Sequence, residues 1–128
     1  MGEWIDMDAK YNYRDLNAYK EAKIFVQLVY ELLKKFPKEE TYALCDQLRR
    51  AVVSVPSNIA EGMGRFSDKE QLHFLEIAFG SLMEVSCQMD VACDLGYVSK
   101  EDLERVDEKV TVIAALLSGL RKKRLGNG

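Results

Sequence analysis

The single histidine of the chain stands in a pattern that could help to hold a metal. Glu70 and His73 form a Glu-x-x-His pair, and this spacing places a carboxylate and an imidazole on one helix face, as in the di-iron sites of helical bundles. Such a site needs two of these pairs and two further glutamates. Glu70 also fits a capping role, because it stands three residues after Ser67. We therefore expect no metal site.

Nucleophilic catalysis lacks its usual sequence marks. His73 is the only imidazole that could act as a base for a serine or cysteine. The glycines at 62 and 64 join two helical patterns without a preceding strand, which is typical of a helix end rather than of a phosphate-binding loop. Cys45, Cys87 and Cys93 form no C-x-x-C pair, which indicates buried free thiols. The sequence predicts no enzyme, no cofactor and no small-molecule substrate.

Composition and charge define the class of protein. The 128 residues are 48% hydrophobic and 30% charged, which suits one ordered helical domain. No apolar run reaches the roughly 18 residues that a membrane span needs, and the acidic, aromatic start is unlike a signal peptide. We expect a cytoplasmic protein without a membrane partner. The net charge of −3 is uneven, because residues 121–124 are all basic while the rest of the chain is acidic.

Apolar residues recur at helical spacing in four segments, and no segment sustains the alternation typical of strands. The expected helices cover residues 16–35, 38–64 and 67–95, and a fourth runs from Ser99 to the basic cluster. Short connections favour an all-α, antiparallel up-down-up-down four-helix bundle. We expect an N-terminal extension at 1–15, the bundle at 16–125 and a tail at 126–128.

Pro56 stands in the middle of the second helix. The apolar stripe keeps its phase across this proline, which predicts one helix that is bent rather than broken. Ser54, Ser57 and Asn58 are poor choices for a merely solvated helix face. Because Pro56 leaves the carbonyl of Val52 without its donor, we expect these side chains to satisfy the opened backbone or to contact another subunit, with solvation as the ordinary alternative.

The third helix combines an apolar stripe with an acidic face. The residues expected in its stripe are Leu72, Leu75, Phe79, Leu82, Val85, Met89 and Ala92. Gly80 lies in mid-helix, where it costs about 1 kcal/mol relative to alanine, and this favours close approach of a neighbouring helix. Four carboxylates make this helix acidic: Glu76, Glu84, Asp90 and Asp94. A solvated or salt-bridged face explains them.

Basic side chains are the remaining candidates for a functional surface. The cluster at 121–124 ends the last helix, where positive charge also favours the helix dipole. Phosphate contact is the sharper alternative. The residues that we expect to contact RNA or DNA, if it is bound, are Arg49, Arg50, Arg65, Lys69, Arg121, Lys122, Lys123 and Arg124.

Three stretches resemble a known family. "FPKEETYALCDQLRRAVVSVPSNIAEGMGR", "FLEIAFGSLMEV" and "DLGYVS" are similar to the small four-helix-bundle proteins found as open reading frames within bacterial 23S rRNA intervening sequences, also called S23 ribosomal proteins. The resemblance covers roughly residues 15 to 121. Its most specific residues are Gln47, Arg49, Arg50, the stretch from Ser54 to Gly62, Gly80, Ser81 and Glu84.

The resemblance implies an antiparallel bundle that assembles into a five-fold homo-oligomeric ring without enzymatic activity. A related branch, the accessory proteins of diversity-generating retroelements, binds nucleic acid and works with a reverse transcriptase. Those relatives are strongly basic, whereas this chain has a pI near 5.3. We therefore expect an oligomeric scaffold or interaction module, with nucleic-acid binding as the alternative. The residues expected in the structural motif or subunit contact are Ser54, Pro56, Ser57, Asn58, Glu61, Gly62, Gly80 and Glu84.

Overall fold

The protein is a bundle of four α-helices. The computed structural model describes residues 11–126, and this range contains no strand. The helices are α2 (Asn17–Leu33), α3 (Leu44–Met63), α4 (Asp68–Asp94) and α5 (Lys100–Arg124), with short 3-10 helices η2 (Tyr11–Asp15) and η3 (Lys38–Glu40). The all-α prediction is confirmed. None of the helices in residues 11–126 is long and apolar enough to cross a membrane.

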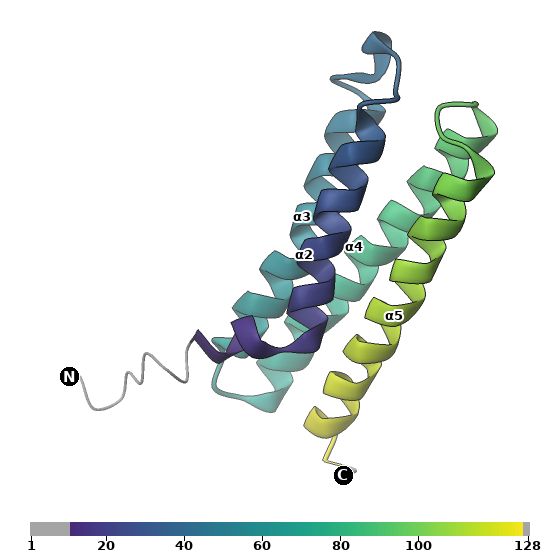
Figure 1. Ribbon diagram of the computed structural model, residues 1–128. Coiled ribbons are helices and arrows are strands. Elements are labelled where there is room, and N and C mark those ends of the chain that lie inside the picture. The colour runs from purple at the N-terminus through teal and green to yellow at the C-terminus, as the bar shows by residue number, and fades with distance from the viewer. Residues whose placement is uncertain (1–10, 127–128) are drawn as a thin grey trace.

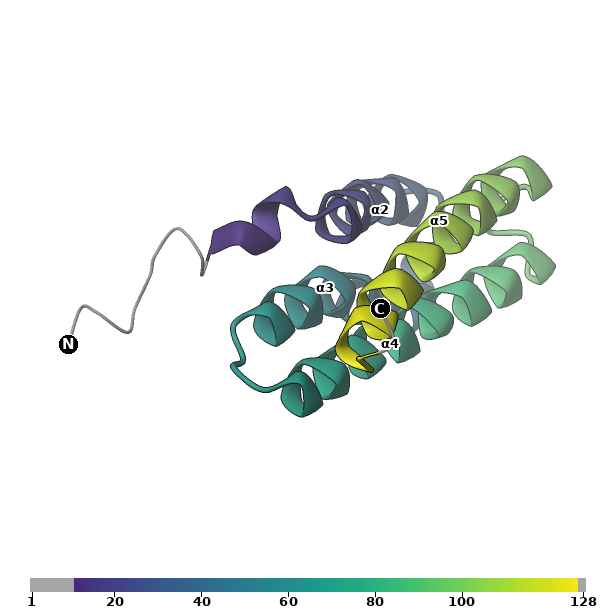
Figure 2. The same ribbon diagram turned by 90° about the horizontal axis from the view of Figure 1, so that it is seen from below.

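Neighbouring helices run in opposite directions, as the up-down-up-down prediction requires (Figure 1). Each helix packs against the next one in the sequence, most extensively α3 against α4, and α2 packs against α5 to close the bundle. In the view from below, α2 therefore lies diagonally opposite α4, and α3 diagonally opposite α5 (Figure 2). The expected extension is described only from residue 11, where η2 packs on α2 and α3.

The core contains fully buried side chains from all four helices. Phe25 of α2, Leu82 of α4 and Ile113 of α5 have no exposed surface. From α3 the buried apolar side chains include Leu48, Val52, Val55 and Ile59. These four keep one face across Pro56, which lies inside an unbroken helix. The prediction of one continuous helix is confirmed, and its bend at the proline stays a prediction.

The second helix begins later than expected. We predicted its start at residue 38, but Lys38–Glu40 form η3 and α3 begins at Leu44. Pro37 precedes the short 3-10 turn in an extended conformation. Glu40 then accepts a hydrogen bond of 3.3 Å from the amide of Leu44, so its side chain satisfies one of the free amides at the start of α3.

The cap predicted from Ser67 and Glu70 forms only in part. Ser67 accepts a hydrogen bond of 3.1 Å from the amide of Glu70, but the Glu70 carboxylate lies 4.0 Å from Arg65 instead of returning to Ser67. The complete capping box is at the start of α5, where Ser99 and Asp102 each accept from the other's amide. At the start of α4, Glu70 therefore does not complete a capping box, since its carboxylate lies near Arg65.

Gly96 follows the end of α4 at Asp94, one residue before the predicted end of this helix. Its φ is +80°, a left-handed conformation that glycine adopts without steric cost. The amide of Tyr97 donates to the carbonyl of Ala92, and that of Gly96 donates to Cys93. This pair of hydrogen bonds is the Schellman motif, which satisfies the last carbonyls of a helix.

Three expected core positions of α4 lie nearer the surface. Phe79 is 43% exposed, Leu72 is half-buried, and Cys87 is exposed, whereas Cys45 is buried and Cys93 half-buried. Leu72 and Phe79 lie seven residues apart in a row on the flank that faces α5, and Cys87 lies in the outermost row. The buried stripe of α4 is narrower than predicted, because two rows of buried α4 side chains already fill the space between α3 and α5.

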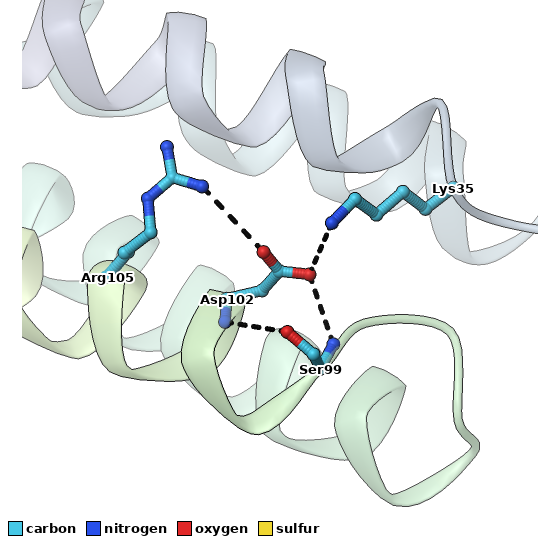
Figure 3. Close-up of polar contacts among 4 residues, drawn as sticks. All are labelled: Lys35, Ser99, Asp102 and Arg105. Carbon is cyan, nitrogen blue, oxygen red and sulfur yellow. Dashed lines mark hydrogen bonds and ion pairs between the residues drawn. The ribbon is translucent and has the colours of Figure 1, made fainter.

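The end of the bundle that carries η3 is held by polar contacts between distant segments. Lys35 Nζ lies 2.7 Å from Asp102 Oδ2, and Arg105 lies 3.7 Å from the other carboxylate oxygen (Figure 3). In addition, the hydroxyl of Tyr97, in the α4–α5 connection, donates to Glu40 of η3 at 2.9 Å. These contacts fix the α2–α3 connection against the α4–α5 connection.

Candidate functional site

The side chains with catalytic potential are dispersed. Within residues 11–126, no three His, Cys, Asp or Glu side chains lie close enough together to hold a metal ion. His73 is exposed on the outer row of α4. Burial raises the pKa of the Cys45 thiol, which disfavours the reactive thiolate.

The polar residues of the proline motif meet α4. Ser54 Oγ and Ser81 Oγ lie 2.8 Å apart and share a hydrogen bond between the two helices. Asn58 Nδ2 donates to both the carbonyl and the hydroxyl of Ser54, each at 2.8 Å. We expected the hydroxyls to serve the carbonyl of Val52, but Ser54 is engaged with Asn58 and Ser81. These side chains therefore connect helices rather than repair the backbone at the proline.

A second contact lies further along the same two helices. Gln88 Nε2 donates to Gln47 Oε1 at 3.0 Å and to Glu84 Oε2 at 3.1 Å. The Oε1 atom of Gln88 is buried and accepts no hydrogen bond from the described part of the chain. We call the whole set of hydrogen-bonded residues the α3–α4 seam: Gln47, Ser54, Asn58, Ser81, Glu84 and Gln88. Five of these six belong to the residues that carry the family resemblance.

The other motif residues have different surroundings. Pro56 is buried, and Ser57 is exposed. Glu61 accepts a hydrogen bond of 2.9 Å from Arg65. Gly62 is buried, and a Cβ added to it would lie 3.0 Å from the Cβ of Phe74. Gly62 therefore allows α3 to approach α4. The sequence analysis interpreted this glycine only as part of a helix end.

Gly80 has no such neighbour. We expected a neighbouring helix to approach it closely, but within the described chain an added Cβ would meet nothing within 4 Å. Gly80 is exposed on the side of α4 that faces away from the bundle. We call this surface the outer face of α4; its exposed residues are Ile77, Gly80, Met83, Glu84, Cys87 and Val91. No helix of the described chain makes this approach, because α4 turns this row away from both of its neighbours in the bundle, and a contact from another subunit stays a prediction.

The structure brings some of the basic residues expected to contact RNA or DNA together at one end of the bundle. The end of α3, the start of α4 and the end of α5 meet there (Figure 1). Arg121, Lys122 and Lys123 are exposed, and none of them makes an ion pair with the described residues, whereas Arg65 pairs with Glu61 and lies 4.7 Å from the ring of Phe74. This basic end therefore has free cations mainly on α5. Lys69 is exposed nearby in the first turn of α4.

Arg124 is not part of that free charge. Its Nε donates to Gln71 at 2.9 Å, and its other nitrogens contact the Leu120 carbonyl at 3.1 Å and the Met63 sulfur at 3.3 Å. Gln71 in turn donates to the carbonyl of Arg65. Arg124 therefore joins α5 to the α3–α4 turn.

The remaining two arginines lie elsewhere. Arg49 and Arg50 belong to the first two turns of α3, about 22 Å along the helix axis from Arg65. Both are near Asp46, at 3.9 Å and 2.9 Å. The predicted phosphate-binding set is thus divided within one molecule, and Asp46 offsets part of the positive charge of the smaller group.

A groove between α4 and α5 was missed by the sequence analysis. It has a volume of about 480 Å³ and is lined by Leu75, Glu76, Phe79, Leu117, Ser118 and Arg121. Spacings of three and four residues on each helix were visible in the sequence, but the distance between the two helices was not. The groove opens beside the basic end and presents the exposed ring of Phe79.

Comparison with known proteins places the chain in a family. Residues 14–119 match the family described as 23S rRNA-intervening sequence protein. No curated protein sequence matches the chain significantly. The crystal structure of a protein of unknown function from the S23 ribosomal protein family of Bacteroides thetaiotaomicron is similar, with a TM-score of 0.75 and 22% identity. That similarity covers 82% of this chain and 98% of the other, and it shows a shared fold. The chain belongs to the 23S rRNA-intervening sequence protein family.

Proposed function

We propose that the protein is a non-enzymatic interaction module that assembles with copies of itself, and that its assembly is the five-fold ring implied by the family resemblance. The outer face of α4 carries this proposal. Ile77, Met83 and Val91 are 38%, 37% and 45% exposed, and the exposed Gly80 and Cys87 connect them at steps of three and four residues along the helix. An apolar surface of this kind on a soluble domain marks an interaction site when its side chains are contiguous.

Gly80 supports the same conclusion. A glycine in mid-helix costs about 1 kcal/mol, and no part of the described chain needs the space that it leaves. A helix of another subunit would gain from it, because the missing side chain lets two backbones approach closely.

Light scattering coupled to size exclusion tests the proposal at micromolar concentration. We expect a mass of five chains of 14.6 kDa each. A monomer at all accessible concentrations would exclude self-assembly, and another discrete oligomer would correct only the number of subunits.

Nucleic-acid binding is the second candidate. The unpaired cations Arg121, Lys122 and Lys123 favour it, because symmetry would multiply them into a larger basic surface. Their neutralisation to glutamine should weaken binding to structured RNA and flatten its dependence on salt by roughly one counterion for each lost phosphate contact. Substitution of Lys38 and Lys100 to glutamine, both exposed at the opposite end of the bundle, is a control with similar loss of charge. Absence of binding at low salt would exclude this function.

A further inference from the structure

The outer faces of α2 and α4 complement one another in charge. After Glu70, α4 has no lysine or arginine and carries four exposed carboxylates, at Glu76, Glu84, Asp90 and Asp94. None of the four makes an ion pair with residues 11–126. They are interspersed with the exposed apolar side chains of Ile77, Met83 and Val91. The exposed surface of α4 therefore combines apolar side chains with unpaired negative charge.

The outer face of α2 has the opposite charge. We define it by its exposed residues Lys20, Lys23, Ile24, Gln27 and Tyr30. The two carboxylates of α2 are already paired, Glu21 with Lys109 at 2.7 Å and Glu31 with Lys34 at 3.0 Å. Lys20 and Lys23 make no ion pair within the described chain, while Ile24 and Tyr30 are 44% and 42% exposed. This face offers unpaired positive charge beside apolar surface.

A hollow beside Lys23 gives this face its shape. It lies between α2 and α3, has a volume of about 460 Å³, and is lined by Tyr19, Val26, Val53 and Pro56 among others. Projecting apolar side chains such as Met83 of a second copy fit such a hollow chemically. The convex face of α4 has no comparable recess at Gly80, where only the space of the missing side chain is open.

We propose that the outer face of α4 binds the outer face of α2 on a second copy of the chain. This inference rests on the proposed self-assembly and assigns its two surfaces. A symmetric α4–α4 contact would instead bring eight carboxylates together, and like charges at an interface disfavour it. Because the two faces differ, the contact is head-to-tail and repeats from copy to copy, and it closes into a ring when the rotation between successive copies divides a full turn.

Charge reversal on each face provides the test. One variant carries Lys20→Glu with Lys23→Glu, a second carries Glu76→Lys with Asp90→Lys, and a third combines all four substitutions. Each two-residue variant should raise the dissociation constant of the assembly at least about tenfold, since two attractive pairs become repulsive. The four-residue variant should recover to within about threefold of the wild type, and an equimolar mixture of the two-residue variants should form mixed assemblies in native mass spectrometry.

The control variant carries Glu104→Lys with Glu108→Lys on α5, where both positions are exposed. It matches the change in net charge of the α4 variant and should assemble like the wild type. Circular dichroism verifies that every variant keeps its helices. A wild-type monomer would overturn the proposed self-assembly together with this inference. An assembling wild type whose two-residue variants assemble equally well, or whose four-residue variant fails to recover, would overturn the face assignment alone.

Discussion

Lys35 Nζ donates a hydrogen bond of 2.7 Å to Asp102 Oδ2 and thereby joins the end of α2 to the start of α5 (Figure 3). Asp102 is only 5% exposed and also accepts from the amide of Ser99 at 3.1 Å. The hydrogen bond from Lys35, with those from Ser99, holds the pKa of Asp102 below its ordinary value. A carboxylate of this kind stabilises the fold while it is ionised.

Asp102→Asn should therefore lower the free energy of unfolding in a pH-dependent way. The loss should be about 1 to 2 kcal/mol at neutral pH, less than for a fully buried pair because the Lys35 side chain is 53% exposed. Above the ordinary aspartate pKa of about 3.9 the contribution is complete, and it disappears as the pH falls through the lower folded value. Urea unfolding at neutral and acidic pH measures this, and Lys35→Met is the matched variant. An equal loss at both pH values would contradict the ionised contact.

Gly62→Ala and Gly80→Ala should change stability in opposite directions. At Gly62 the new methyl group meets the Cβ of Phe74 at 3.0 Å and the Gln71 carbonyl at 3.4 Å, so crowding should outweigh the helix propensity of alanine by about 1 kcal/mol. At Gly80 nothing is crowded within the chain, and stability should rise by about 0.5 to 1 kcal/mol in the dissociated state. Gly119→Ala on α5 is the control for Gly80, because its added Cβ also meets nothing within 4 Å. Thermal unfolding at fixed, low protein concentration compares the three variants, and equal shifts at 62 and 80 would refute the packing role of Gly62.

Ser54→Ala and Ser81→Ala should interact in a double-mutant cycle. Each substitution removes one partner of the 2.8 Å hydrogen bond between α3 and α4, so each should cost about 1 kcal/mol. The double variant should lose less than the sum, because the second substitution removes a partner that is already unsatisfied. Chemical unfolding measures the coupling, and strict additivity would show that the two hydroxyls act independently.

Arg124→Ala should destabilise the protein, whereas Lys123→Ala should not. The guanidinium of Arg124 contacts Gln71, the Leu120 carbonyl and the Met63 sulfur, and its removal should cost about 1 to 2 kcal/mol. Lys123 is exposed, so its removal should remain within about 0.5 kcal/mol. Unfolding curves measure the contrast, which would be absent if Arg124 were only a surface cation.

The positions of the four helices could be predicted because periodicity and caps agree along most of the chain. The phase of Leu48 and Ile59 across Pro56 identified one helix where the proline alone would have suggested a break. The boundary at Leu44 was missed, since it depends on a contact from the Glu40 side chain that spacing does not reveal. Phe79 was placed in the core because its row is apolar, although two other rows already fill that space.

The candidate surfaces were less predictable, because they depend on which helices meet. Ser54 and Ser81 are 27 residues apart in sequence, and their hydrogen bond exists because α3 and α4 run antiparallel from a short turn. The same rod-like geometry separates Arg50 from Arg65, although both belong to the predicted nucleic-acid contacts. Charge and spacing identified the residues, and the packing of helices decided which of them are neighbours.

The closure of α2 against α5 also has a kinetic consequence. The other extensively packed pairs, α2–α3, α3–α4 and α4–α5, consist of helices that follow each other in the sequence, so each pair is joined by a short loop. The contact between α2 and α5 instead joins segments that are separated by most of the chain. Both ion pairs between these helices, Lys35 with Asp102 and Lys109 with Glu21, lie on this one distant contact. Such contacts form late in folding, because their loop entropy is the largest. Their strength should therefore govern how slowly the bundle opens rather than how fast it forms.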